Sequence, residues 1–329
     1  MTKTMTRVAP YGSGPAPDST GGNGTERSGT GKSRTDNRGP GRRGAGNRPS
    51  VLLSRAGVTA MLGLAALYTL LPMLWLFLSS TKSRQDLFAT NGFAPGKDFA
   101  LVDNLKYLFQ VDNGIFLRWL LNTVLYAGVG SLLATVFSVA AGYTFDKLNF
   151  PGKERLFSFV LLGVMVPGTA MAIPLYLLAA KAGLVNSFWG VFIPGLVFPF
   201  GVYLARVFSA SYIPNEVLEA ARVDGAGEFR TFCRIGLPMI APGFVTIFLF
   251  QFTQIWNSFF LPLVMLSDKD LFPVNLGLYV WYSSALSQGH PQDYLLAIVG
   301  SLVSVVPLVI LFLMLQRFWK SGMTAGAVK

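Results

Sequence analysis

The stretch EVLEAARVDGAGEFRTFCRIGLP, residues 216–238, places a block of charged, helix-forming residues between two long apolar runs. Asn215, or the step from Ile213 to Pro214 before it, offers a helix start. Glutamates follow in the first turns, where the helix dipole favours negative charge. Gly225 is predicted to end this helix, because glycine adopts positive φ angles at little cost.

A second short helix is predicted from about residue 227, and Leu237 and Pro238 are predicted to end it and lead into the next apolar run. Three apolar residues at i, i+3, i+4 spacing would anchor this helix: Phe229, Phe232 and Cys233. The pattern predicts a helix–turn–helix elbow with apolar anchors and charged outer positions. It leaves open a second interpretation, an amphipathic loop at the membrane surface that binds no partner.

The rest of the chain is strongly apolar. Charged residues make up 13% of it, compared with about 25% in soluble domains. Six apolar runs are each long enough to cross about 30 Å of hydrocarbon as a helix: 56–79, 119–143, 156–180, 188–209, 239–266 and 295–318. Prolines that predict kinks or breaks lie in three of them: Pro167, Pro174, Pro194, Pro199 and Pro307. The predicted fold class is an all-α polytopic membrane protein with six transmembrane helices, with the elbow between the fourth and the fifth.

The distribution of Lys and Arg indicates the orientation. With the N-terminus in the cytoplasm, the segments after residue 50 carry eleven Lys/Arg on the inner side and seven on the outer side. The segment 267–294 holds one lysine and three aspartates, which fits an outer face. We therefore expect a multi-pass protein of the cell membrane with both termini and the elbow in the cytoplasm.

Residues 1–50 have a different composition. They carry nine Lys/Arg and three Asp/Glu, are rich in small and polar residues, and cannot bury enough apolar surface to offset the ordering entropy. We predict a disordered, basic cytoplasmic tail near the anionic membrane surface, followed by a six-span domain over 51–329. The run GTGKS at 29–33 resembles half a phosphate-binding loop, but Glu26 replaces its first glycine and no strand precedes it, so neither a nucleotide site nor a nucleic-acid partner is expected.

Ionisable residues are absent from the cores of the six apolar runs; Arg206 and Arg317 lie at run ends. Carriers driven by proton or sodium gradients usually need such groups within the membrane. One cysteine excludes an internal disulfide, and one histidine argues against a His-built metal site or a Ser-His-Asp triad. The chain is therefore predicted to be no enzyme and to bind no cofactor, and energy for uphill transport would come from another subunit.

The residues EAARVDGAGEFRTFCRIGLP resemble the EAA loop of ABC importer permeases. The seven fixed positions of that loop all match in type and spacing: Glu219, Ala220, Ala221, Gly225, Ile235, Leu237 and Pro238. Three further segments resemble the carbohydrate-importer branch of that superfamily: YTFDKLNFPGKERLF after the second run, QIWNSFFLPL in the fifth, and the ending SGMTAGAVK. The resemblance covers about residues 51–329. Within that branch, the chain is similar to the second permease of maltose-type systems.

The resemblance implies a set of partners. Two ATPase subunits would bind ATP and Mg and hydrolyse the nucleotide, and a second homologous permease would supply the second elbow. An extracytoplasmic solute-binding protein would dock against 80–118 and 267–294 and deliver a sugar. The aromatic residues of the outer face suit either this docking or the interfacial belt of the lipid bilayer: Trp281, Tyr282 and Tyr294.

The elbow would then be the coupling helix that docks in a groove of the ATPase. Glu219 would make a charge-assisted contact there, Gly225 would allow the bend, and the apolar packing of Leu218, Ala220 and Ala221 would supply much of the docking energy. The expected coupling residues are Leu218, Glu219, Ala220, Ala221, Asp224, Gly225, Ile235, Leu237 and Pro238.

Polar but uncharged groups within the runs are the candidates for the substrate pathway: Asn122, Gln251, Gln254, Trp256 and Asn257. Amides beside aromatic rings suit a neutral polyol such as a sugar, and Gln251, Gln254 and Ser258 would share one helix face. The same amides could instead join helices by hydrogen bonds, or the partner permease could hold the sugar. Alternatives to a sugar are a glycerol phosphate ester or an amino acid, and the alternative of another class is a channel or secondary carrier.

Overall fold

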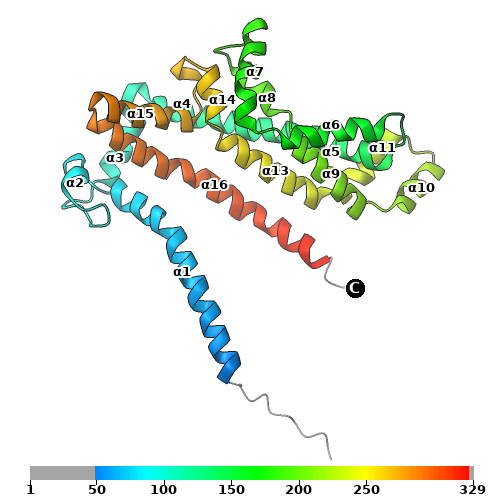
Figure 1. Cartoon of the computed structure of the whole chain (residues 1–329), viewed down its shortest axis with the longest axis horizontal. Helices are drawn as coiled ribbons and strands as arrows, with labels where there is room; N and C mark the ends of the chain where they lie inside the picture. Colours follow the sequence, from blue (N-terminus) through cyan, green and yellow to red (C-terminus); the bar gives the residue numbers. More distant parts are fainter. Residues whose placement is uncertain (1–48, 326–329) are drawn as a thin grey trace, which may run out of the picture. The chain divides into compact units, whose positions relative to one another are not determined.

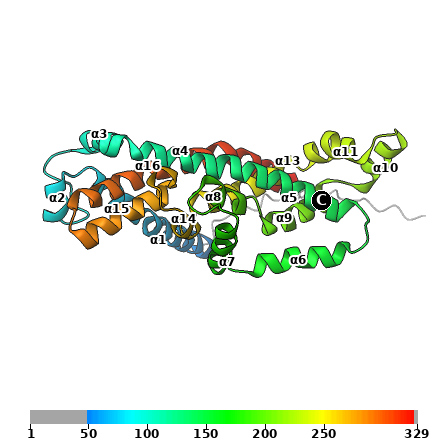
Figure 2. The same ribbon diagram turned by 90° about the horizontal axis from the view of Figure 1, so that it is seen from above.

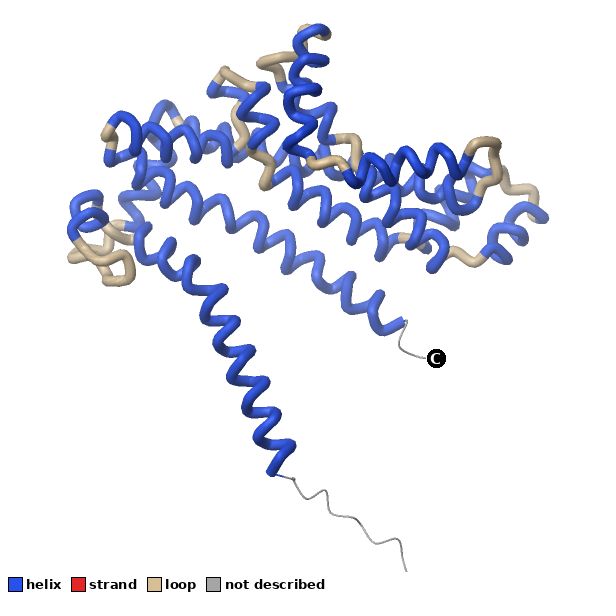
Figure 3. The backbone as a smooth tube through the Cα atoms, in the orientation of Figure 1, coloured by secondary structure: helices blue, strands red, loops and turns tan. Residues whose placement is uncertain are grey.

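The computed structural model describes residues 49–325 and, within that range, the side chains of residues 56–316. The predicted tail covers residues 1–50; residues 1–48 lie outside the described residues, and Pro49 and Ser50 begin the first helix. Figure 3 shows helices and loops and no strand in the described part, which confirms the all-α class. The contacts discussed below lie within residues 60–329, the larger of the two units into which the chain divides.

The elements, labelled as in Figure 1, follow one another along the chain as helices and short helical turns. In order they are α1 (Pro49–Ser80), α2 (Arg84–Ala89), α3 (Leu101–Gln110), η1 (Val111–Asn113), α4 (Ile115–Val124), η2 (Leu125–Val129), α5 (Gly130–Lys147), α6 (Lys153–Met165), α7 (Gly168–Lys181), α8 (Phe188–Gly195), α9 (Pro199–Tyr212), α10 (Asn215–Val223), α11 (Glu228–Thr231), η3 (Phe232–Gly236), α12 (Leu237–Met239), α13 (Ala241–Trp256), α14 (Phe260–Met265), η4 (Lys269–Leu271), α15 (Val274–Gln288) and α16 (Pro291–Ala325).

Four helical segments of the described chain are long and apolar enough to cross a membrane: 56–80, 115–147, 188–212 and 291–316. They correspond to the first, second, fourth and sixth apolar runs. Two bent helix pairs pass the same test when each pair is taken together, which brings the number to as many as six. By length and composition, the described chain thus has four to six helical segments that could cross a membrane.

The third apolar run bends instead of continuing straight. The chain bends by 106° between α6 and α7, and Pro167 occupies the position just before α7. Proline restricts the residue before it to extended conformations, so Val166 (ψ 122°) leaves the helical region. Pro174 behaves differently, since α7 continues through it.

The fifth apolar run, predicted as one span over 239–266, is broken twice. Ile240 separates α12 from α13 with a bend of 79°. α13 ends at Trp256, and α14 begins only at Phe260. Pro262 lies in the first turn of α14, where its missing N–H costs nothing, so it starts a new helix more readily than it continues an old one.

Close helix packing builds the part of the core that supports the elbow. Gly142 of α5 lies against α9, where an added Cβ would come within 2.4 Å of the Ala205 Cβ. Beside this crossing, a cluster of buried residues joins α5 to the elbow and to α13: Ala134, Val139, Tyr143, Phe198, Ala205, Ile213, Leu218, Ile240 and Ile247.

The segment between α1 and α3 is organised around a fully buried lysine. Lys82 Nζ donates to Asn91 O at 2.7 Å and to Thr90 Oγ1 at 3.0 Å. Asn104 Nδ2 donates to the carbonyls of Ser80 and Lys82, both at 2.9 Å. The two bonds of the lysine offset the cost of removing its ammonium group from water, and the two bonds of Asn104 fix the chain after α1.

Candidate functional site

The elbow, residues 215–239, has the local geometry that its glycine predicts. α10 begins at Asn215, and Gly225 adopts φ +76°. Gly225 N–H donates to Arg222 O at 3.0 Å, and Ala226 N–H donates to Ala221 O at 2.9 Å. This pair of bonds is the Schellman motif, in which a left-handed glycine closes the helix end. No atom lies within 4 Å of the place where a Cβ would be added, so conformation and not space selects glycine here.

The second half of the elbow differs from the prediction at its end. α11 begins at Glu228, after Gly227, as expected. It continues through the π-helical turn η3 into α12, so Leu237 and Pro238 do not end it; the bend falls at Ile240. Pro238 has no N–H, and the helix continues through it after a π-helical turn in which Leu237 N–H donates to Phe232 O, five residues back. Ile235 and Leu237 are half-buried, and Pro238 is exposed.

Two of the residues expected to contact the ATPase point into this chain instead. Leu218 is 2% exposed and Ala221 6%, and Leu218 packs in the cluster with Ile213 and Ile240. The spacing of Leu218 and Ala221 marks the inner face of an amphipathic helix, because apolar residues three apart lie on the same side. They therefore anchor α10 to the bundle, and the prediction that they supply docking energy is wrong.

The apolar surface that the elbow exposes comes from other residues. Val223 is 88% exposed and Phe229 81%, one on each side of the Gly225 turn. Phe229 was predicted as an anchor, and its exposure contradicts that role. Glu219, Ala220 and Asp224 are also exposed. An aromatic residue this exposed in a charged surface indicates a site of contact with a partner. Helical spacing alone does not reveal that Phe229 is exposed.

An ion pair closes the elbow across its turn. Arg222 Nε lies 2.8 Å from Glu228 Oε1, with both side chains nearly half-exposed. The hydrogen bond to Glu228 raises the pKa of the Arg222 guanidinium above its usual range, so its charge is constant at all working pH values. The pair joins α10 to α11 and adds a constraint to the Schellman turn.

Side chains from the end of α5 hold the elbow against the bundle. Lys147 Nζ donates to Asn215 Oδ1 at 3.0 Å, at the first residue of α10. The rings of Tyr143 and Phe232 lie 5.0 Å apart, and a Cβ on Gly236 would come within 3.1 Å of the Tyr143 ring. Figure 2 shows α10 and α11 beyond the end of α5 and α9. Both halves of the elbow are thus joined to α5.

The predicted pathway residues do not gather on one face. α13 ends before Asn257 and Ser258, so the face shared by Gln251, Gln254 and Ser258 does not form. Gln254 is exposed, Gln251 is 2% exposed, and Trp256 is packed with Phe252 and Ala127. Asn257 Nδ2 donates to Thr253 O at 2.9 Å, four residues back, at the end of the helix.

Gln251 fills a gap left by a proline. Its Nε2 donates to Gly195 O at 2.7 Å. The normal partner of that carbonyl would be the N–H of residue 199, which is proline and has none. Gln251 thus satisfies the carbonyl freed at the break between α8 and α9, as bilayer proteins require. Its Oε1 is buried and has no hydrogen-bond partner within the described chain.

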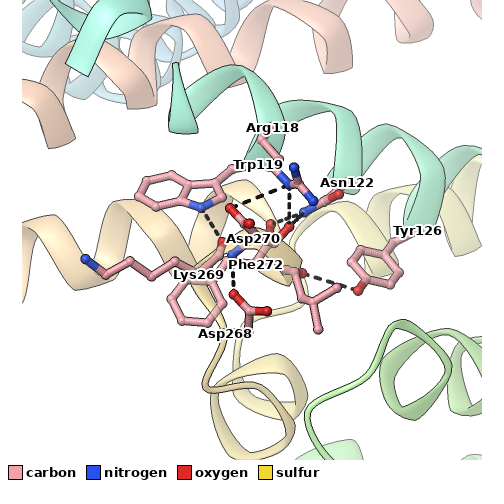
Figure 4. Close-up of polar contacts among 9 residues, drawn as sticks. Arg118, Trp119, Asn122, Tyr126, Asp268, Lys269, Asp270 and Phe272 are labelled. Carbon is pink, nitrogen blue, oxygen red and sulfur yellow. Dashed lines mark hydrogen bonds and ion pairs between the residues drawn. The ribbon is translucent and has the colours of Figure 1, made fainter. Parts of the chain in front are cut away.

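Asn122 belongs to a group of side chains on α4 and η2 that bind the backbone of one segment (Figure 4). That segment, residues 265–274, joins α14 to α15 and is largely non-helical. Asn122 Nδ2 donates to the carbonyls of Asp270 at 2.8 Å and Phe272 at 3.0 Å. Trp119 Nε1 donates to Lys269 O at 2.8 Å, and Tyr126 Oη to Leu271 O at 3.3 Å.

Further contacts complete this arrangement. Arg118 Nε donates to Asp270 O at 3.1 Å, and Thr123 Oγ1 accepts from Val274 N–H at 2.7 Å. Asn186 holds the other end of the segment, since its Oδ1 accepts from the N–H groups of Ser267 and Asp268. Together these side chains satisfy backbone carbonyl and N–H groups that the segment, being largely non-helical, does not pair within itself.

Comparisons with known proteins point to one family. A family model described as binding-protein-dependent transport system inner membrane component matches residues 134–320, which include α5 after its first turn and the whole elbow. The arabinooligosaccharides transport system permease protein AraQ of Halalkalibacterium halodurans is 32% identical over 80% of this chain and 92% of its own length. The lactose transport system permease protein LacG of Rhizobium radiobacter is 30% identical over 82% of this chain and 94% of its own.

Among solved structures, a bacterial ABC transporter involved in the import of the acidic polysaccharide alginate contains a chain with a similar fold. The TM-score is 0.71 at 21% sequence identity, covering 82% of this chain and 98% of the other. The family match extends over more than half of the chain, and the AraQ match covers most of both sequences. This chain therefore belongs to the family of binding-protein-dependent transport system inner membrane components.

Proposed function

We propose that this chain is one of two membrane-spanning permease subunits of an ABC importer, and that it forms with a second, homologous permease the pathway for a sugar. The observation that carries the proposal is the elbow: its EAA-type spacing coincides with a Schellman turn at Gly225 and an exposed apolar tip. Relatives named as permeases for arabinooligosaccharides and for lactose support a carbohydrate substrate. A solute-binding protein outside the cell would deliver it.

In this proposal six segments cross the membrane: the α6–α7 pair counts as one span, and α13 is the fifth span, with the elbow before it outside the bilayer. Both termini and the elbow lie in the cytoplasm, as the excess of Lys and Arg there favours. The 265–274 segment then lies at the outer side. α2, α3 and α15, together with the aromatic residues Tyr282 and Tyr294, would offer the surface on which the binding protein docks.

The elbow would dock on a separate ATPase subunit, which binds ATP and Mg and carries out hydrolysis. Phe229 and Val223 supply the apolar contact, while Glu219 and Asp224 place negative charge beside them. The partner surface that fits is an apolar pocket with basic residues at its rim. The docking face would be held in place by side chains that pack on its inner side: Leu218, Ala221, Ile235 and Leu237.

Among the pathway candidates, Gln254 and Asn257 are exposed and are the two that we retain for sugar contact. Amide groups offer both the donors and the acceptors that sugar hydroxyls need. Asn122, Gln251 and Trp256 bind other parts of this chain, so we assign them to the framework of the pathway.

Reconstitution tests the proposal. The chain would be purified with its partner permease, ATPase and binding protein, placed in proteoliposomes, and supplied with labelled arabino-oligosaccharides, lactose, glycerol 3-phosphate or an amino acid. Uptake that requires ATP, the binding protein and a saccharide is expected. Flux without ATP would instead indicate a channel, and uptake of the phosphate ester or amino acid in place of the sugars would contradict the carbohydrate assignment.

A further inference from the structure

The helical segment 115–147, formed by α4, η2 and α5, is bound at both of its ends to segments that come much later in the chain. Near its first end, Arg118, Trp119, Asn122, Thr123 and Tyr126 bind the backbone of 265–274. The carbonyls of four consecutive residues, 269–272, all accept from these side chains. The segment therefore has little freedom to move independently of α4.

Packing reinforces the hydrogen bonds at this end. Trp119 is 2% exposed, and its ring lies 4.6 Å from that of Trp281 on α15. A Cβ on Gly277 would come within 2.0 Å of the Trp119 ring, so the glycine lets the indole lie directly on α15. α4 thus contacts both the 265–274 segment and the helix that follows it.

The other end of the same helical segment holds the elbow. Lys147 binds Asn215, and Tyr143 packs on Phe232 and Gly236. Asp146 adds a link to α9, because Ser209 Oγ donates to its carboxylate at 2.7 Å. At 1.5 Å per residue, the 33 residues of the segment extend over about 50 Å, more than the roughly 40–45 Å of a bilayer with its headgroups.

We propose that Trp119 and Asn122 are positioning residues, through which the 265–274 segment moves with α4–α5 when the elbow moves. The inference rests on the proposed function, in which ATP moves the elbow and the 265–274 segment faces outward. A helix is stiff along its axis, and displacement of α5 by the elbow would displace α4 with it. The side-chain bonds to carbonyls 269–272 would carry that displacement into the segment next to the docking surface.

Two labels on the complete reconstituted transporter test this directly. In a Cys233→Ser background, one protein carries a spin label at Glu216→Cys on the elbow, and a second carries it at Lys269→Cys; both positions are exposed. The spectra are compared with and without ATP trapped by vanadate. With α4 and α5 unaltered, the spectrum of each label is expected to change when ATP is trapped.

The decisive variant is Trp119→Phe with Asn122→Leu, which removes three of the five hydrogen bonds to these carbonyls. Lys269 O and Phe272 O lose their donors, while Asp270 O keeps Arg118 and Leu271 O keeps Tyr126. The elbow label should respond as before, while the label at Lys269 no longer responds. Stimulation of the ATPase by the binding protein should fall on the order of tenfold, with basal hydrolysis retained. Should the double variant fail to assemble, Asn122→Leu alone gives the same comparison with two bonds removed.

Trp281→Phe is the matched control, because it removes a neighbouring buried indole ring that makes no hydrogen bond to the 269–272 carbonyls. It should leave both label responses and the coupling unchanged. An unaltered response at Lys269 in the double variant would overturn the proposal, and so would an equal loss in Trp281→Phe, which would indicate packing alone. If the Glu216 label ignores ATP in the unmodified transporter, the proposed function itself fails.

Discussion

Gly225 shows how a single residue determines the shape of the elbow. Its φ of +76° costs other L-residues about 1–2 kcal/mol, and no neighbouring atom obstructs a side chain there. We expect Gly225→Ala to loosen the end of α10 and Gly225→Asn to do so less, since asparagine tolerates this conformation better. Hydrogen–deuterium exchange of the amides of 224–226 measures the effect.

Gly227 supplies the control for that prediction. Open space also surrounds the place where a Cβ would be added to Gly227, but its φ is −71°, which every residue adopts readily. Gly227→Ala should leave the exchange of 224–226 unchanged. Equal acceleration in both alanine variants would mean that the positive φ angle does not determine the turn.

Leu218 and Phe229 lie in the same elbow and should respond oppositely to truncation. Leu218 is buried, so Leu218→Ala should destabilise the chain by about 2–5 kcal/mol, seen as a lower thermal midpoint in detergent. Phe229→Ala removes an exposed ring and should leave that midpoint nearly unchanged. It should instead weaken co-purification of the ATPase subunit. Normal ATPase binding by the Phe229 variant would exclude the exposed tip as the docking contact.

At the scale of elements, the break between α8 and α9 depends on a side chain from α13. Gln251→Leu keeps the volume but leaves Gly195 O without its donor, at a cost of about 1–3 kcal/mol. Gln254→Leu, one turn further along the same helix and exposed, should cost little. The thermal midpoints of the two purified variants make the comparison, and equal midpoints would show that the Gly195 carbonyl finds another partner.

The helices themselves could be predicted from the sequence, because apolar runs of this length have few other stable forms in a bilayer. Helix breaks were harder to predict. Pro167 ends a helix whereas Pro174 and Pro307 lie inside one, and the difference depends on which neighbours satisfy the freed carbonyls. The same limit explains the break after Trp256, which no periodic pattern marks.

The contacts to 265–274 illustrate a second limit of sequence reasoning. Arg118, Asn122 and Tyr126 recur every four residues on an otherwise apolar helix, a signal that could have indicated one polar face. Their partners, however, are backbone carbonyls, and every residue type carries one. The residue types at 269–272 do not identify these carbonyls as acceptors. The hydrogen bonds between α4 and this segment could therefore be found only in the three-dimensional structure.

For the whole molecule, the proposed topology makes a prediction about the two sides of the membrane. The elbow and the 265–274 segment are separated by one proposed span, α13, so they should face opposite compartments. In a Cys233→Ser background, an impermeant thiol reagent should label Lys269→Cys in intact cells or spheroplasts. Glu216→Cys should react only after permeabilisation, because the elbow must meet an ATPase in the cytoplasm. Both sites are exposed, so a failure to react means that the membrane keeps the reagent from the cysteine and not that the cysteine is buried. Labelling of both cysteines from one side would mean that α13 does not cross, and the six-span arrangement would then be wrong.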